Sequence, residues 1–118
     1  MLLLLLTVGV AATEDWPQWR GAGRDGVAMQ STPLLNAVPV EGPKMIWEYA
    51  LPAAAPKAPY YFSPVVVGDK VLIGSYNGSL YGLSARDGKL AWSVKTNGYV
   101  HGTPLVSAGI AYIAGCDE

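Results

Sequence analysis

Short runs of strand-forming residues, separated by turn dipeptides, constrain the fold of this chain most strongly. The runs cover residues 65–67, 71–76, 80–85 and 90–94, and the dipeptides between them are Gly-Asp, Asn-Gly and Asp-Gly. Alternating side chains in such short runs indicate β-strands, because successive side chains of a strand point to opposite faces. Asn-Gly and Asp-Gly indicate tight hairpins with type I′ turns, which need two residues with positive φ. The stretch therefore predicts a four-stranded antiparallel meander.

The meander begins to repeat further along the chain. Ser63-Pro64-Val65-Val66 is echoed forty positions later by Thr103-Pro104-Leu105-Val106. Residues 68–73 align with residues 108–113, and KMIW at 44–47 matches KLAW at 89–92. A period near forty residues with four strands per unit indicates the blades of a β-propeller. We expect an all-β fold, a β-propeller of four-stranded antiparallel blades, with only one full blade plus partial flanking blades in this chain.

The order of these units predicts a fragment. A lone outer strand at residues 44–51 precedes one full blade at 63–95, and two strands of the next blade follow. A propeller uses such a leading strand to close its ring by completing the last blade. Blades also stack on neighbours to bury their faces, so one and a half blades cannot close a ring. We expect incomplete propeller repeats over residues 44–118 and an N-terminal fragment of a longer protein.

The first twelve residues, MLLLLLTVGVAA, are apolar and uncharged. This run is far short of the ~20 residues that a membrane helix needs, and it fits the apolar region of a secretory signal peptide. We expect residues 1–12 to be a signal peptide cleaved after Ala12, and the protein to be periplasmic or secreted. The alternative is that translation starts at a later codon. Residues 13–43, a Trp-, Arg- and Gly-rich leader followed by a Pro-rich segment, then lead into the repeats.

The charge balance excludes two classes of partner. Eight Lys and Arg residues against nine Asp and Glu residues leave a formal net charge of −1. This balance supplies no basic surface for nucleic acid and no polybasic patch for a membrane. The expected partner is a protein, with no nucleic acid and no stable membrane span.

One stretch resembles a known repeat. GSYNGSLYGLSARDGKLAW, residues 74–92, resembles the PQQ-like β-propeller repeat, whose usual form is G-S-x-D-G-x-L-Y-A-L-D-A-x-T-G-K-x-x-W. The sequence departs from that form with Gly82 for Ala, Ser84 for Asp and Asp87 for Thr. DWPQWRG, residues 15–21, also looks like the leader of exported PQQ-repeat proteins. The resemblance implies tryptophans that dock each blade onto its neighbour, and Trp47 and Trp92 fall on that position.

The family's name raises the possibility of a quinone-dependent dehydrogenase. The resemblance implies, for those enzymes, a stacking Trp, a Ca²⁺ held by Glu, Asn and Asp, a catalytic Asp and commonly a vicinal Cys pair. Cys116 is the sole cysteine, and the carboxylates are scattered along the chain, whereas Ca²⁺ takes six to eight oxygen ligands. We therefore predict no catalytic, cofactor-binding or metal-binding residue here, and PQQ and calcium only if the site lies in later blades.

Two stretches before the inner strands are weak candidates for a ligand face. His101 lies on the linker to the second blade, near the central funnel where many propellers bind ligands. We favour a loop histidine that hydrogen-bonds to the backbone. Tyr60 and Tyr61, with Phe62, occupy the equivalent place before the first blade. These aromatic residues could rim a binding face, but we favour hydrophobic capping between blades.

The leader carries a third candidate. Arg20, Arg24 and Asp25 could bind an anion, and the glycine spacing resembles that of a phosphate loop. No apolar strand precedes these residues, and no Gly-Lys-Ser/Thr follows them, which argues against a nucleotide site. We expect the leader to lie across the propeller as a packed and ion-paired tail.

Three functions fit these features. The one that we favour is an exported, non-catalytic propeller that scaffolds protein contacts, similar to the outer-membrane assembly factor BamB. The second is a PQQ- and calcium-dependent quinoprotein dehydrogenase whose site lies in downstream blades. The third is a sensor or carbohydrate-binding propeller fused to another domain. Fold alone does not choose among them, because one fold hosts many unrelated functions.

Overall fold

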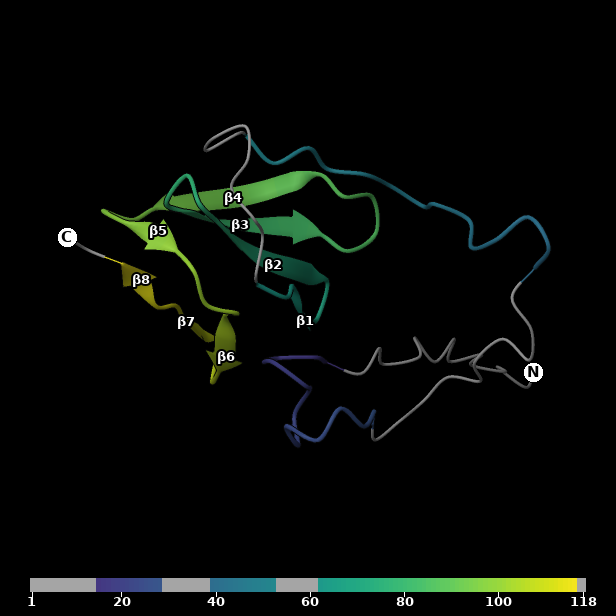
Figure 1. The fold of residues 1–118 in the computed structure, drawn as a ribbon, viewed down its shortest axis with the longest axis horizontal. Coiled ribbons are helices and arrows are strands. Elements are labelled where there is room, and N and C mark those ends of the chain that lie inside the picture. Colours follow the sequence, from purple (N-terminus) through teal and green to yellow (C-terminus); the bar gives the residue numbers. More distant parts are fainter. Residues whose placement is uncertain (1–14, 29–38, 53–61, 117–118) are drawn as a thin grey trace, which may run out of the picture.

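Eight β-strands and no helix make up the regular structure of the residues described in a computed structural model, namely 15–28, 39–52 and 62–116 (Figure 1). The signal peptide expected over residues 1–12 lies outside them, and no helix within them is long and apolar enough to cross a membrane. The strands are β1 (Val65–Val67), β2 (Lys70–Ser75), β3 (Ser79–Ser84), β4 (Leu90–Lys95), β5 (Tyr99–Val100), β6 (Leu105–Ser107), β7 (Ile110–Tyr112) and β8 (Gly115–Cys116).

The first four strands form one antiparallel sheet in the order β1-β2-β3-β4, which confirms the predicted meander. The second repeat begins in the same way. Val65 pairs with Leu72 in the first hairpin, and Leu105 pairs with Tyr112 in the second. Both members of the second pair lie forty positions after those of the first, so the two hairpins have the same register. β5 and β8 form a separate two-stranded sheet. The strand pairing is therefore that of a partial β-propeller built from repeated antiparallel hairpins.

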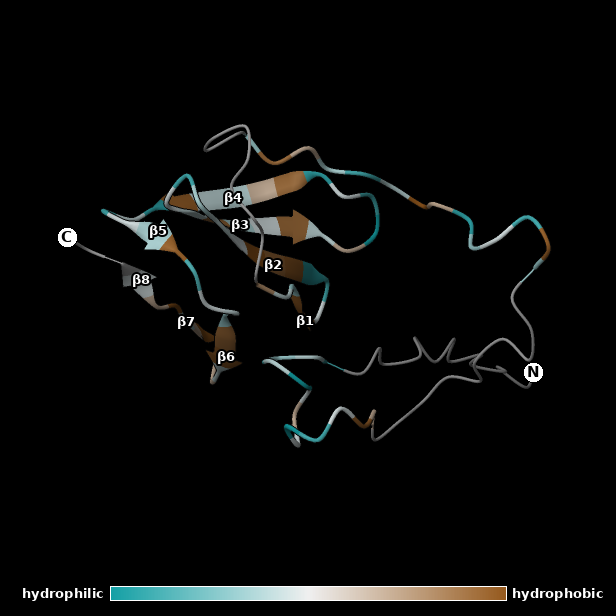
Figure 2. Cartoon of the chain, viewed as in Figure 1, coloured by the Kyte–Doolittle hydropathy of each residue, from teal (hydrophilic) through white to brown (hydrophobic). Residues whose placement is uncertain are grey.

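The core lies between the two repeats. Val65, Leu72 and Leu80 form a buried cluster on one face of the first sheet. β1 and most of β2 are brown, that is hydrophobic, in Figure 2. The second repeat covers this face with three partly buried apolar side chains, Val106, Ala111 and Ile113. Burial of aliphatic surface between the sheets drives this stacking, at roughly 25 cal/mol for each Å² removed from water.

The expected type I′ turns are wrong at Asn-Gly and Asp-Gly. Ser75 pairs with Ser79 across a three-residue loop, in which only Gly78 has a positive φ, +76°. A type I turn followed by a left-handed glycine also matches the twist of the two strands, so the dipeptide does not fix the loop length. Two consecutive positive φ angles occur instead at Ala108 (+48°) and Gly109 (+76°), between β6 and β7.

Residues 44–51 form no strand within the described part of the chain, contrary to the sequence prediction. The segment contacts the first sheet through side chains rather than through a ladder of main-chain hydrogen bonds. Tyr49 lies with its ring centroid 6.2 Å from that of Tyr81. The amide of Asn77 donates to the carbonyl of Pro52 at 3.3 Å. Strand assignment needs a main-chain partner, and apolar pattern alone cannot supply one.

Candidate functional site

Four aromatic side chains gather where the turn between β2 and β3 meets β5. We call Phe62, Tyr76, Tyr99 and His101 the aromatic cluster. Tyr76 is its centre: its ring centroid lies 5.9 Å from that of Phe62, 5.9 Å from that of Tyr99 and 4.5 Å from that of His101. The last pair is T-shaped, with an interplanar angle of 73°. Offset and edge-to-face contacts of this kind are the favoured geometries for aromatic rings.

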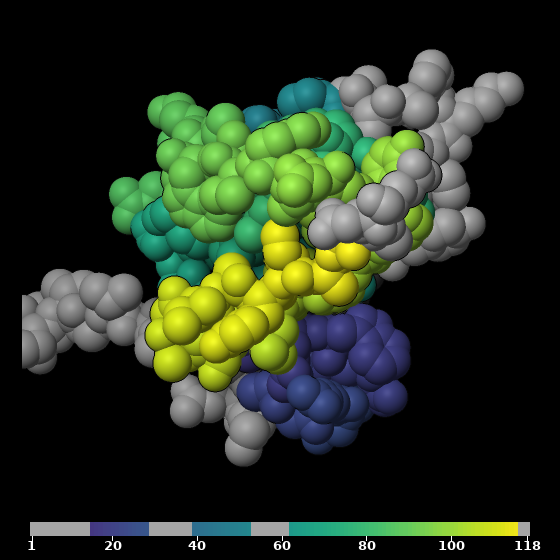
Figure 3. Space-filling view, turned by 90° about the vertical axis from the view of Figure 1, so that its left-hand side faces the viewer, coloured from purple at the N-terminus to yellow at the C-terminus, as the bar shows by residue number. Residues whose placement is uncertain are grey.

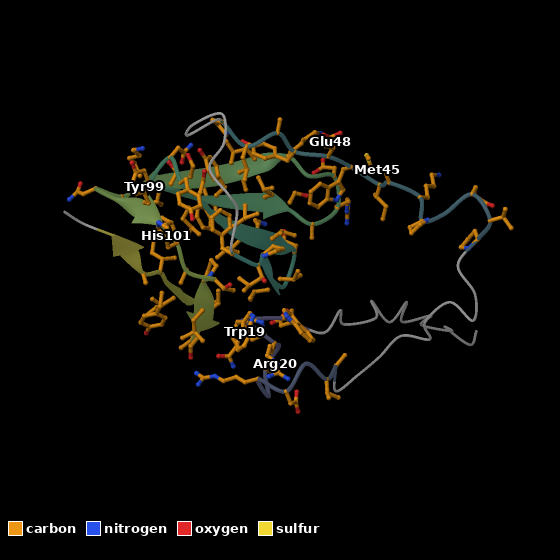
Figure 4. The ribbon with its side chains drawn as sticks, in the orientation of Figure 1. Trp19, Arg20, Met45, Glu48, Tyr99 and His101 are labelled. Carbon is orange, nitrogen blue, oxygen red and sulfur yellow. The ribbon has the colours of Figure 1, made fainter. Side chains whose placement is uncertain are left out.

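The cluster combines a buried centre with an exposed rim. Tyr76 is buried, whereas 54% of the surface of Tyr99 is exposed and His101 is exposed as well. Figure 4 labels Tyr99 and His101 near β5. The hydroxyl of Tyr76 and Nδ1 of His101 lie 3.2 Å apart and share a hydrogen bond whose direction depends on the histidine tautomer. We expected His101 to hydrogen-bond to the backbone. For Nδ1 this prediction is wrong, because its partner is the side chain of Tyr76.

Sequence reasoning did not select Tyr99, Tyr76 or their contact with His101. Tyr99 lies in a two-residue strand that no alternating run announced, and Tyr76 was assigned to the end of a strand. The candidates Tyr60 and Tyr61 lie outside the described residues. The available signal was the position of Tyr76 one residue before Asn-Gly, because the residues of a hairpin loop lie at one end of the sheet.

A hydrogen-bond network fixes the turn that carries Tyr76. Asn77 Oδ1 accepts from the Ser79 amide at 3.0 Å, and Asn77 Nδ2 donates to the Tyr81 hydroxyl at 2.5 Å. The amide of Thr96 donates to the carbonyl of Gly78 at 2.7 Å. A Cβ atom on Gly78 would lie 2.6 Å from the carbonyl oxygen of Gly98, so the linker rests directly on this glycine. The turn and the linker therefore hold Tyr76 and the segment bearing Tyr99 in one arrangement.

Close packing also sets the path of β5 across the first sheet. Val100 is fully buried, and a Cβ atom on Gly74 would lie 2.6 Å from its side chain. Only glycine at position 74 leaves room for this approach. Val100 therefore anchors β5 against the sheet, with the exposed Tyr99 and His101 on either side of it in the sequence.

The two tryptophans at equivalent repeat positions have different surroundings. The indole Nε1 of Trp47 donates to the carbonyl of Ala85 at 2.9 Å, and its ring packs over Gly88 in the turn between β3 and β4. Trp92 stands opposite Gly82 in the β3–β4 register, and its ring lies over that glycine. Trp47 is half-buried, whereas Trp92 is 37% exposed.

Comparison with known proteins identifies the family. The family model described as outer membrane protein assembly factor BamB, a PQQ-repeat model, matches residues 34–118. The chain belongs to the BamB family of PQQ-repeat proteins. It is also similar to two polyvinylalcohol dehydrogenases, one from a Pseudomonas species and one from Sphingopyxis sp. (strain 113P3).

The similarity to these dehydrogenases is low in identity and covers a small part of them. The Pseudomonas protein is 27% identical over 111 residues, which make up 91% of this chain and 16% of that protein. The Sphingopyxis protein is 24% identical over 101 residues, which make up 86% of this chain and 14% of that protein. The chain thus spans less than one fifth of the length of either relative.

The carboxylates of this PQQ-repeat chain do not fit a calcium–quinone site within the described residues. There, no three His, Cys, Asp or Glu side chains gather closely enough to hold a metal ion. Hydrogen bonds from Ser84 and Lys89 lower the pKa of Asp87 to about 2. A hydrogen bond and the nearby charge of Lys70 lower the pKa of Asp69. Both carboxylates lie in exposed hairpin turns. Asp69 is paired with Lys70 at 2.6 Å, and Asp87 is paired with Lys89 at 3.1 Å.

The leader of this PQQ-repeat protein is packed only in part, and the expected ion pairs are absent from residues 15–28. Residues 16–18 are partly buried and Gly21 is buried, whereas the other residues of the leader are exposed. Arg20 donates to the main-chain carbonyl of Asp25 at 3.1 Å, and its guanidinium lies 5.5 Å from the centroid of the Trp19 ring. Arg24 donates to the side-chain oxygen of Gln18 at 3.0 Å. Both arginines thus use neutral partners, and the carboxylate of Asp25 accepts from the amide of Val27.

Proposed function

We propose that this chain is part of an exported β-propeller that binds other proteins without catalysing a reaction. The family to which it belongs carries the description of an outer membrane protein assembly factor. The observation that carries the proposal is the aromatic cluster, which pairs a buried Tyr76 with an exposed Tyr99 rim on a turn fixed by hydrogen bonds. Residues 1–12 act as the signal peptide in this proposal and place the protein in the periplasm or outside the cell.

The chemistry of the cluster suits a protein partner. Tyrosine offers a large ring with few rotatable bonds and a polar hydroxyl, which is why it is enriched at the centres of protein interfaces. The Tyr76 hydroxyl already has His101 as a partner, so the exposed part of the cluster is mainly the Tyr99 ring and the imidazole edge. Pre-organised aromatic anchors lose little entropy on binding, which increases affinity.

Site-specific photo-crosslinking tests this surface. A photoreactive phenylalanine at position 99, in the full-length protein in its own cells, should form a covalent adduct with one defined partner protein. The control places the same group at Lys89, an exposed position by the turn at the opposite end of β3. The proposal requires an adduct from position 99 that His101→Ala weakens. Equal adducts from both positions, or none from position 99, would contradict it.

The two polyvinylalcohol dehydrogenases support a second candidate, a PQQ- and calcium-dependent dehydrogenase. In that case the quinone and its metal would be held by residues other than those described, because the described carboxylates do not form such a site. The full-length protein should then reduce an electron-accepting dye with polyvinyl alcohol after PQQ and Ca²⁺ are added. Turnover would establish a dehydrogenase and overturn the non-catalytic proposal. Failure of the protein to bind PQQ would exclude the dehydrogenase.

We also propose that residues 44–118 form the first blades of the ring and that Trp47 and Trp92 dock neighbouring blades. The bond from Trp47 to Ala85 supports this role, since it joins residues 38 positions apart across a segment and the sheet that follows it. An indole that buries its ring and satisfies its N–H in one contact is well suited to such docking.

A further inference from the structure

The leader makes main-chain hydrogen bonds to β1, the edge strand of the first sheet, and we call the free side of β1 its inner edge. The amide of Trp16 donates to the carbonyl of Val66 at 2.6 Å, and the amide of Val66 donates to the carbonyl of Trp16 at 2.9 Å. This reciprocal pair is an antiparallel bridge to β1, the strand at one edge of the four-stranded sheet. An exposed strand edge is a template for pairing, and here the leader occupies part of it.

The same leader also reaches the second repeat. The amide of Val106 in β6 donates to the carbonyl of Pro17 at 2.8 Å. Val66 and Val106 occupy equivalent positions in the two repeats, and their partners are the consecutive carbonyls of Trp16 and Pro17. Figure 3 shows the purple leader packed beside the yellow second repeat. One extended stretch therefore satisfies the same amide in two successive blades.

Side chains add selectivity to this main-chain contact. The carboxylate of Asp15 accepts a hydrogen bond from the amide of Gly68, in the turn after β1, at 2.7 Å. The ring of Trp16 packs within the leader itself, against Gly21, where φ is +78° and a Cβ atom would lie 2.9 Å from the ring. Pro17 contributes only its carbonyl, which suits a residue without an amide hydrogen. Asp15 therefore adds a side-chain contact to the first sheet, whereas Trp16 and Pro17 contact the two repeats through main-chain groups.

We propose that the inner edges of β1 and β6 form a peptide-binding site that takes an extended Asp-Trp-Pro segment by strand addition. Its occupant is the leader of this same chain, which ties the equivalent inner strands of two blades together. Main-chain hydrogen bonds supply the affinity and the Asp15 carboxylate supplies selectivity, as in other complexes that form by strand addition. The inference does not depend on the protein partner or on any catalytic activity.

A peptide-addition experiment tests the site directly. The chain lacking residues 15–28 should bind a synthetic peptide of sequence DWPQWRG in a saturable one-to-one manner, measured by calorimetry. A matched peptide with an N-methyl group on the tryptophan that corresponds to Trp16 keeps the ring but loses the donor to Val66. It should bind about tenfold more weakly or worse, because the lost bond leaves a carbonyl unsatisfied. Equal affinity of the two peptides would overturn the proposal.

Amide exchange in the intact chain provides a second test, which stands even if the shortened chain does not fold. The amides of Val66 and Val106 should both exchange slowly, and Trp16→Pro should speed both by at least about tenfold. Amides in β3, which the leader does not contact, serve as the internal reference. Fast exchange of the Val66 and Val106 amides in the unaltered chain, at the rate of an unprotected amide, would show that the leader does not occupy this edge.

Discussion

Trp47 and Trp92 occupy the same place in two copies of one sequence pattern but do not share an environment. Trp47 packs on the turn that follows β3 and donates its indole hydrogen to Ala85. Trp92 lies over Gly82 of its own sheet, with 37% of its surface exposed and no indole hydrogen bond within the described residues. Trp47 thus takes part of its environment from the turn of the following repeat, and we propose that this position is completed in that way.

The two faces of the first sheet are covered by different parts of the chain. Val65, Leu72, Gly82 and Trp92 form one row across the four strands on the face that the second repeat covers. Cover is complete at Val65 and Leu72 but not at Trp92. The opposite face carries Tyr81, against which Tyr49 packs. The first sheet therefore lies between two neighbours, as a propeller blade does.

Removal of the docked indole should have the largest effect. Trp47→Ala removes a half-buried ring and leaves the Ala85 carbonyl without its partner, so it should lower the free energy of unfolding by about 3 kcal/mol. Urea denaturation followed by circular dichroism measures the loss. Trp47→Phe is the matched control, because it keeps most of the ring and removes only the donor. A loss below about 1 kcal/mol for Trp47→Ala would show that the contact does not stabilise the sheet.

The two glycines beneath the tryptophans sharpen the comparison. Gly88→Ala places a Cβ atom 2.6 Å from the Trp47 ring and forces alanine to adopt a φ of +69°, so it should cost about 2 kcal/mol. In Gly82→Ala the new Cβ atom also meets the Trp92 ring, but position 82 has no φ in the left-handed region and the exposed ring is free to move away. It should cost about 1 kcal/mol. Equal losses in urea denaturation would mean that the surroundings of the two rings do not differ.

Trp92→Ala should have a smaller effect than Trp47→Ala in this chain. The ring is partly exposed, and its indole donates no hydrogen bond to any residue that the structure describes, so we expect a loss of about 1 kcal/mol. In a longer protein in which a following turn covers Trp92, the loss should rise to about 3 kcal/mol. Measurement of both proteins in urea separates the two cases. The same small loss in the longer protein would contradict the docking role proposed for Trp92.

Acid should weaken the turn on which Trp47 rests, with the smallest effect of the set. Asp87 lies in that turn, and its pKa is about 2 in the folded protein against an ordinary value of 3.8. Because the folded state lowers this pKa, the stabilisation is present above about pH 4 and is lost as the pH falls toward 2. Thermal unfolding measured from pH 5 to pH 2 should show a smaller decline in Asp87→Asn than in the unaltered chain. Parallel declines would show that Asp87 does not contribute.

Much of the fold was predictable from the sequence because its signals are local. The alternating run at residues 71–76 and the echo of Val65 at Leu105 gave the strands and the period, and the two hairpins share one register. The turn type at Gly78 was not predictable, because a dipeptide does not determine how many residues a loop contains. The strand expected at residues 44–51 failed because strand formation depends on a main-chain partner.

The candidate site was harder to predict because its contacts are long-range. His101 was selected as a loop histidine, but its partner Tyr76 lies 25 positions earlier in the chain. The bridge from Trp16 to Val66 joins residues that share no pattern, since main-chain groups of any residue can pair in this way. Pattern reasoning therefore found the frame of the repeat and the position of one site residue, but not the contacts that assemble the cluster.

Hydrogen exchange at the indole nitrogens of Trp47 and Trp92 tests most directly the claim that the following repeat completes this position. In the chain of residues 1–118, NMR should show the Trp47 indole hydrogen exchanging at least about tenfold more slowly than that of Trp92, because only Trp47 has a carbonyl partner in the turn of the following repeat. Ala85 belongs to that turn, and Gly88→Ala should bring the Trp47 rate toward the Trp92 rate. Equal exchange of the two indoles in the unaltered chain would contradict the claim that the following repeat completes this position.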